Sequence, residues 1–288
     1  MSPIYKLRDW IPVEKLSWDT LSKNPNAIQL LEENQDKINW VNLSGNPNAM
    51  HLLKQNPDKI CFHRLCSNTN PEAIRMLEEN YDKIHWPILS SNPNAISLIE
   101  LRLKEPYIPE YHSLDFRSPQ PYKNIHWGYL SMNPNAIHLL EQNPEQIDWA
   151  YLSKNPNAIQ LLEQNPDKIN WYSLSQNPNA IHLLEQNPDK ISWFWLYDNP
   201  NAIHIFEQYP EKMKLSNLSH NPNAIQLLEK TPDKINWHHL SQNPAIFTYD
   251  YDAMRESHKD FKQELMQSAW HPSRIQKWLE AGLDLEDI

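Results

Sequence analysis

The residue types best suited to chemistry in this chain are two cysteines and 13 histidines. Cys61 and Cys66 flank His63 in the segment CFHRLC, and two thiols beside an imidazole could begin a zinc site. A fourth ligand is not evident in the sequence, and both cysteines stand where matching segments of the chain carry other small residues. We therefore expect no metal ion, and two reduced structural thiols.

The histidines also fall on repeated positions, and none has an evident base or nucleophile as a partner. Four share one polar position of a repeated segment, and four lie next to its aromatic residue: His51, His138, His182 and His204, then His85, His126, His238 and His239. Three scattered glycines cannot build a nucleotide-binding loop. We predict that the protein is not an enzyme, has no cofactor and has no small-molecule substrate.

The frame behind these positions is a 22-residue repeat with the consensus LSxNPNAIxLLExNPDKIxW. Two extra residues precede its third marker, and 19 enter between the fourth and the fifth. The Asn of each Asn-Pro start marks the repeats at Asn24, Asn46, Asn70, Asn92, Asn133, Asn155, Asn177, Asn199, Asn221 and Asn243. A segment this short cannot bury enough apolar surface alone, so consecutive repeats must stack.

Each repeat is expected to form two short helices. Asn155 is a helix N-cap with Pro156 in the first turn, and the apolar residues between 158 and 162 share one face. A second helix begins after Asn170, where Trp171 and Leu174 lie on the same side. The alternation of Ile and Trp in the KIxW segment leaves a short parallel strand as the alternative.

These elements predict an all-α fold, an α-solenoid of about ten two-helix repeats with N- and C-terminal caps. The alternative is an α/β solenoid with a strand at KIxW. Stacked helix layers at about 8–10 Å give a rod or superhelix roughly 80–100 Å long. The expected divisions are a cap or half repeat at 1–23, repeats at 24–100, an insertion at 101–122, repeats at 123–247 and a helical cap at 248–288.

Both ends depart from the repeat, as the ends of a solenoid should. Residues 5–11 are expected to cover the open side of the first half repeat. After the last repeat, the sequence predicts an amphipathic helix capped by Asp250 and a final helix that begins at Pro272 and stops at Gly282. The apolar residues of the first of these helices are expected in a core; they are Met254, Phe261, Leu265 and Met266.

Charge and hydropathy narrow the classes of partner. The formal net charge is −10, spread over the repeats, which argues against a nucleic acid partner. No run of about 18 apolar residues predicts a membrane span, and the start MSPIYKLRDW does not resemble a secretory signal. We expect a cytoplasmic protein that does not enter a membrane.

The residues that vary within the fixed frame are the candidates for binding. The two positions after the repeat's aromatic residue are rich in rings in the middle of the array, and exposed Tyr and Trp often anchor protein interfaces. The insertion offers further aromatic and basic side chains. The predicted contacts of a protein partner are Tyr129, Tyr151, Tyr172, Phe194, Trp195, His238 and His239, with Tyr107, Tyr111, Phe116 and Arg117 in the insertion. The rings could instead pack between neighbouring repeats.

A second function fits another variable position. The polar position of the first helix could read single-stranded RNA at one base per repeat, although the negative charge argues against it. This series is Gln29, His51, Arg75, Ser97, His138, Gln160, His182, His204 and Gln226. A structural component of a virus particle is a third alternative.

The repeat consensus, the opening LRDWIPVEKLSWDTLS and the close ELMQSAWHPSRIQKWLEAGLDLEDI together resemble the short-repeat proteins of giant DNA viruses related to mimivirus. The resemblance covers essentially the whole chain. It implies a viral repeat protein in the host cytoplasm, with a viral or host protein as its partner, and it implies no catalytic residue.

Overall fold

The computed structural model describes residues 3–105, 124–257, 259, 263–264, 266–267 and 270–281. The chain divides into two compact parts. Arg8–Phe247 holds all the repeats and is called the repeat body here. Met1–Leu7 and Thr248–Ile288 form the terminal body.

Each repeat begins with a helix of about one turn that starts at its aromatic residue or at Leu215. These aromatic helices are α1 (Trp18–Leu21), α3 (Trp40–Ser44), α5 (Phe62–Leu65), α7 (Trp86–Ser90), α9 (Trp127–Ser131), α11 (Trp149–Leu152), α13 (Trp171–Leu174), α15 (Trp193–Leu196), α17 (Leu215–Leu218) and α19 (Trp237–Ser241).

The second helix of a repeat carries the leucines. These leucine helices are α2 (Ile28–Glu32), α4 (Met50–Gln55), α6 (Pro71–Glu79), α8 (Ile96–Lys104), α10 (Ile137–Gln142), α12 (Ile159–Glu163), α14 (Ile181–Gln186), α16 (Ile203–Gln208) and α18 (Ile225–Glu229).

Turns of 3₁₀ helix connect the helices. They are η1 (Val13–Lys15), η2 (Gln35–Lys37), η3 (Pro57–Lys59), η4 (Tyr81–Lys83), η5 (Pro93–Ala95), η6 (Pro144–Gln146), η7 (Pro166–Lys168), η8 (Pro188–Lys190), η9 (Pro210–Lys212), η10 (Pro222–Ala224), η11 (Pro232–Lys234) and η12 (Pro244–Ile246). The KIxW segment follows such a turn, with Ile169 extended but unpaired in any strand. The α/β alternative is therefore wrong, and the all-α solenoid class is confirmed.

The capping residues explain where the helices start. The Asn170 side chain accepts from the backbone N–H of Ser173, so it caps α13 as predicted. The leucine helix begins later than predicted, at Ile159 instead of Pro156. The reason is that Asn155 Oδ1 accepts from the N–H of Asn157, which closes a turn before the helix.

A buried asparagine binds each repeat to the one before it. The Asn177 amide donates to the carbonyl oxygens of Ser153 and Asn155, at 3.1 and 2.8 Å, and its Oδ1 accepts from the N–H of Asn179. We call this series the asparagine ladder. The same pair of donations is made by Asn24, Asn46, Asn68, Asn92, Asn133, Asn155, Asn199 and Asn243.

A buried serine adds a second connection. Ser153 Oγ donates to the carbonyl oxygen of Trp149 and accepts from the N–H of Asn170 in the next repeat, at 2.7 and 3.0 Å. Burial of these polar groups is tolerated because each one has a partner. The interface between repeats is thus fixed by directional bonds as well as by apolar packing.

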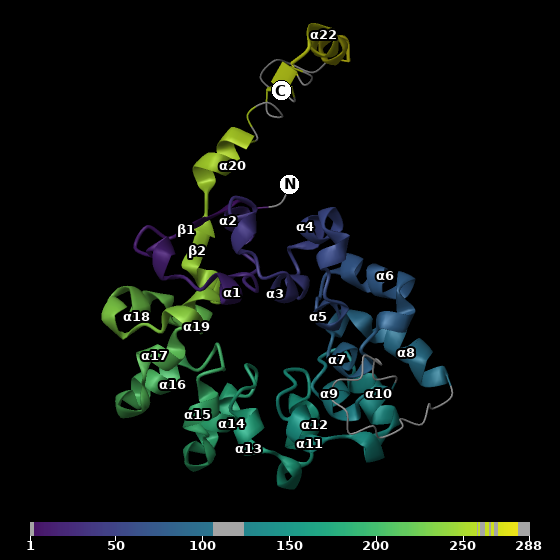
Figure 1. Ribbon diagram of the computed structural model, residues 1–288, viewed down its shortest axis with the longest axis vertical. Helices are drawn as coiled ribbons and strands as arrows, with labels where there is room; N and C mark the ends of the chain where they lie inside the picture. The colour runs from purple at the N-terminus through teal and green to yellow at the C-terminus, as the bar shows by residue number, and fades with distance from the viewer. Residues whose placement is uncertain are drawn as a thin grey trace. The chain divides into compact units, whose positions relative to one another are not determined.

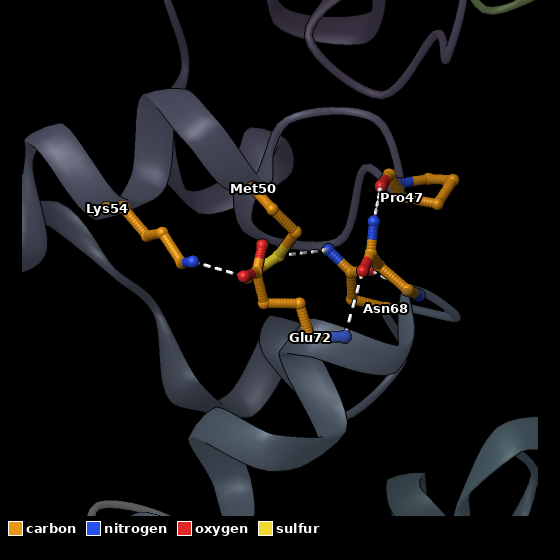
Figure 2. Close-up of polar contacts among 6 residues, drawn as sticks. Pro47, Met50, Lys54, Asn68 and Glu72 are labelled. Atoms are coloured by element: carbon orange, nitrogen blue, oxygen red, sulfur yellow. Dashed lines mark hydrogen bonds and ion pairs between the residues drawn. The ribbon is translucent and has the colours of Figure 1, made fainter. Parts of the chain in front are cut away.

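The two extra residues of the third repeat lie later than the sequence suggested. Asn68, and not Asn70, is the ladder residue, and its amide also points at the Met50 sulfur (Figure 2). Asn70 instead donates to the carbonyl oxygen of Pro47 and caps α6. The added residues therefore lengthen the start of α6, and the ladder spacing before them stays at 22 residues.

The 19-residue insertion leaves the ladder intact. Asn133 donates to the carbonyl oxygens of Ser90 and Asn92, at 2.9 and 3.0 Å, as if the two repeats were adjacent in sequence. The repeats on either side of the insertion therefore stack directly on each other.

The repeat body closes into a ring. The Asn24 amide of the first repeat donates to the carbonyl oxygens of Ser241 and Asn243 in the last, at 3.1 and 2.9 Å. The Ser17 N–H also donates to Ser241 Oγ. Figure 1 shows α1 beside α19, with the other repeats following in order between them. The expected rod or superhelix is wrong, because the last repeat covers the open side of the first.

The terminal body holds β1 (Tyr5–Leu7) and, from Thr248 on, β2 (Phe247–Tyr249); the two strands pair in a two-stranded sheet. Asp250 caps α20 (Tyr251–Ser257) as predicted, since its Oδ1 accepts from the N–H of Ala253. The final helix α22 (Pro272–Glu280) also begins as predicted. Met254 is half-buried, while Met266 is exposed, so its expected core position is wrong. Phe261, Leu265 and Gly282 lie outside the described residues.

Candidate interaction surface

In two consecutive repeats, a ring at the first position after the aromatic residue points away from the repeat body. Tyr172 on α13 and Phe194 on α15 are 68% and 70% exposed, in two consecutive repeats. Large rings at this exposure gain little from the fold, because most of their surface stays in water. In these two repeats the first position therefore displays an aromatic ring to solvent.

In several repeats the second position packs back onto the preceding repeat. Asn42 is buried and donates to the carbonyl oxygen of Asp19, which holds the first position of the repeat before. Tyr129 and Tyr151 are half-buried and meet edge to face, with ring centroids 5.5 Å apart. For these two tyrosines the structure favours the packing alternative over a free binding surface.

Trp195 is a large ring that stays 38% exposed at the second position, where Arg64 is exposed as well. The preceding repeat carries the small Ser173 there, and Lys154 from two repeats back lies with its Nζ 5.6 Å from the Trp195 ring centroid. Phe194 meets Trp195 edge to face at 5.0 Å. We call Tyr172, Phe194 and Trp195 the aromatic face.

His238 and His239 belong to a cluster of imidazoles near the ring closure. The His239 ring lies 5.9 Å from that of His220 and 6.0 Å from that of His238. Burial, followed by the charges of these two neighbours, lowers the pKa of His239. His239 is half-buried and His238 exposed, so only His238 is open to a partner.

The remaining predicted contacts fall in the insertion. Tyr107, Tyr111, Phe116 and Arg117 lie outside the described residues.

Cys66 takes the structural role that its position predicted. It stands where other repeats have the buried serine, and its Sγ accepts from the N–H of His85 at 3.3 Å. Burial raises the pKa of the Cys66 thiol to about 11, which keeps it protonated. Across the described residues, no three His, Cys, Asp or Glu side chains converge as a metal site would require.

Histidines of the polar series on the leucine helices bind glutamates of the preceding repeat. His182 lies 3.0 Å from Glu163, and His204 lies 3.0 Å from Glu185. Similar pairs join His51 to Glu32 and His138 to Glu100. The proposed RNA-reading positions are thus occupied, in four repeats, by contacts between neighbouring repeats.

Sequence reasoning missed a cation above most of the aromatic residues. Lys168 Nζ lies 4.5 Å from the ring centroid of Trp149 in the repeat before it. Six further pairs repeat this contact at 4.3–5.9 Å: Lys15–Trp237, Lys37–Trp18, Lys59–Trp40, Lys83–Phe62, Lys190–Trp171 and Lys212–Trp193. The spacing of Lys and Trp in successive consensus copies was the available signal. Each lysine covers one face of a half-exposed ring.

No family model, no curated protein and no solved structure matches this chain. Among the described residues, no helix is long and apolar enough to cross a membrane.

Proposed function

We propose that the protein is a non-enzymatic scaffold that binds a protein partner through its aromatic face. The observation that carries the proposal is the exposure of three rings in two consecutive repeats, Tyr172, Phe194 and Trp195, at 68%, 70% and 38%. Tyr and Trp dominate the binding energy of protein interfaces, where they fill pockets on the partner. A soluble frame that displays three such rings in two neighbouring repeats is suited to that role.

The frame beneath these rings supports the same function. The helices α13 and α15 are tied to their neighbours by Asn177 and Asn199 of the ladder, so the rings are presented from a rigid base. A preorganised surface loses less conformational entropy when it binds. The aromatic face can therefore contribute affinity without first being ordered.

RNA binding has weaker support. Four histidines of the polar series already contact glutamates, and these carboxylates place negative charge where a phosphate backbone would run. The formal net charge of −10 acts in the same direction.

The resemblance to giant-virus repeat proteins extends the proposal to the partner. We propose a viral or host protein met in the cytoplasm of an infected cell. Mass spectrometry of purified virus particles tests the structural alternative, which requires the protein to be packaged in a fixed ratio to known particle components.

The test replaces the whole aromatic face with residues that the frame already accepts. Serine occupies the first position at Ser216 and the second at Ser173, so the variant combines Tyr172→Ser, Phe194→Ser and Trp195→Ser. Affinity purification followed by binding of the purified partner should show at least about a 100-fold loss, since three anchors are removed. The thermal melting curve should stay close to that of the parent protein.

The matched control is Val41→Ser, which changes an exposed apolar residue at the first position of another repeat. This variant should retain the partner. A partner that binds the triple variant at full strength would contradict the proposal, and so would the absence of any protein that distinguishes the parent from the triple variant.

A further inference from the structure

Two lysines border the aromatic face, and neither belongs to the repeat consensus. Lys154 follows the buried serine of its repeat, and its Nζ lies 5.6 Å from the ring centroid of Trp195, two repeats further on. The repeat between them carries only the small Ser173 at the second position, which leaves room for this contact. Lys154 is half-buried, so its charge is held at the edge of the aromatic face.

The second lysine, Lys214, stands directly before α17, where other repeats have a helix cap. Asn170 and Asn236 at this position accept from backbone N–H groups of their own helices, whereas the Lys214 side chain has no acceptor and makes no such bond. The loss of a side-chain cap weakens a short helix. A role as a cap therefore does not account for this exposed lysine.

The geometry of the stack places Lys214 next to Phe194. In two other repeats, the side chain before an aromatic helix contacts the first position of the preceding repeat. These contacts are a hydrogen bond from Asn39 to Asp19 and an edge-to-face pair of His63 and His85, with ring centroids 4.6 Å apart. Lys214 and Phe194 hold the same two positions. The aromatic face thus has one cation near Trp195 and a second near Phe194.

The carboxylates on the aromatic helices of this region already have partners. Asp148 Oδ1 accepts from two backbone N–H groups of α11, at 3.0 and 3.2 Å, and Asp198 Oδ1 lies 2.9 Å from His220 Nε2. The glutamates of α12 and α14 bind histidines of the following repeats. Among the described residues, neither Lys154 nor Lys214 pairs with a carboxylate. Both charges are therefore open to a partner.

Building on the proposed function, we infer that the partner meets the aromatic face with an acidic segment. Its apolar side chains lie against the three rings, and its carboxylates lie beside Lys154 and Lys214. Exposed charges interact over about 8 Å at physiological salt. A carboxylate beside these lysines therefore interacts mainly with them, and only weakly with the acidic residues elsewhere in a chain of net charge −10. Complementary charge of this kind selects the partner and speeds its association.

The experiment compares two blocked peptides, Asp-Leu-Phe-Asp-Asp-Leu-Phe-Asp and its neutral isostere with Asn in place of every Asp. Eight extended residues span about 26 Å, which is enough for two repeats of about 10 Å each. Calorimetry with the full-length protein should show the acidic peptide binding about tenfold more tightly, since two ion pairs form at the surface. This preference should shrink as salt is raised.

A double variant locates the effect. Lys154→Gln copies Gln176, and Lys214→Asn copies Asn170, so the frame already accepts both residues at these positions. The double variant should bind the two peptides with equal affinity, and its melting temperature should not fall.

The matched control removes the same amount of charge elsewhere on the chain. Lys23→Gln copies Gln242, and Lys230→Gln copies Gln164, and both lysines are exposed. This control should keep the tenfold preference for the acidic peptide.

Three results would overturn the inference: a preference retained by the Lys154→Gln, Lys214→Asn protein, equal binding of the two peptides to the parent protein, or no saturable binding of either peptide. Failure of the proposed function has a different signature, because the triple serine variant of the aromatic face would then bind both peptides as the parent does. If that variant lost both peptides and the parent showed no charge preference, the aromatic face would remain a binding site and only the acidic partner would be wrong.

Discussion

The interface that closes the ring and an interface inside the array use the same bonds. At the closure, the Asn24 amide donates to two carbonyl oxygens at 3.1 and 2.9 Å, and inside the array Asn177 does so at 3.1 and 2.8 Å. Lys15 covers Trp237 at the closure as Lys168 covers Trp149 inside. The ladder bonds and the lysine over the ring are therefore the same at the closure and in the interior.

The residues that pack around these bonds differ between the closure and the interior. The last repeat has no leucine helix, because η12 runs directly into β2 after Asn243. Ile11, Ile246 and Phe247 are buried there instead, and Arg8 Nε donates to the carbonyl oxygen of Ala245 at 2.7 Å. The comparison indicates that the closure needs the same asparagine bonds as the other interfaces. The apolar residues around those bonds can differ, because Ile11, Ile246 and Phe247 take the place of a leucine helix there.

The largest test of this comparison is the removal of a ladder amide. Asn24→Ala at the closure and Asn155→Ala inside the array should each lower the free energy of unfolding by about 3 kcal/mol or more, because each leaves buried backbone groups without a partner. Chemical denaturation measures both. Asn157→Ala, which removes one exposed bond to Pro134, is the control and should cost about 1 kcal/mol or less.

If Asn24→Ala cost much less than Asn155→Ala, the closure would be a loose contact, and the equivalence of the two interfaces would be lost.

The next test is acidification, which should act on the interior through His85. Burial, followed by the charge of His63, lowers the pKa of His85 from 6.5 to about 4. The unfolded chain binds the proton more readily, so stability is complete above pH 6.5 and falls as the pH drops toward 4. The loss is about 2 kcal/mol after allowance for the partial exposure of the ring. Melting curves across this pH range measure it.

The control is His85→Asn, since asparagine caps the equivalent helix at Asn170. This variant should lose most of that pH dependence. The closure has Ser17 at the position of His85, while His239 on α19 has a lowered pKa of its own and would supply the pH dependence that remains in the variant. An unchanged pH profile in His85→Asn would assign the effect to another group.

The smallest test addresses the cation above the ring. Lys15→Met and Lys168→Met should each lower stability by about 0.5–1 kcal/mol, because methionine keeps an apolar stem and loses the charge. Differential scanning calorimetry resolves such changes as a small shift in Tm. Lys234→Met should be silent, because its repeat stacks on Leu215, which has no ring. A larger loss for Lys15 than for Lys168 would indicate that the closure depends more strongly on its cation.

Much of a single repeat could be predicted from the sequence. The 22-residue spacing, the cap at Asn170 and the burial of Leu162 and Leu174 all follow from local rules of capping and periodicity, and the structure confirms them. Closure could not be predicted in this way. Closure depends on the small rotation of each repeat relative to the next, which adds up over all the interfaces. No local pattern in the sequence predicts the size of that rotation.

The contacts of the polar side chains between repeats could not be predicted from the sequence either. Asn155 is a plausible helix cap in isolation, yet its amide spans the interface to the preceding repeat. The two positions after the aromatic residue looked equivalent in sequence. Their difference comes from the direction of each side chain on a one-turn helix, which sends Tyr172 outward and turns Tyr151 toward Tyr129.

Ring closure also limits how the gene for this protein can change in length. An open array can gain or lose a copy at either end, whereas here a duplication or deletion would alter the angle at every interface at once. Extra sequence is tolerated where it leaves and rejoins one interface, as between Asn92 and Asn133. We therefore expect related chains to keep the copy number constant and to differ in such excursions and in the residues that follow each tryptophan.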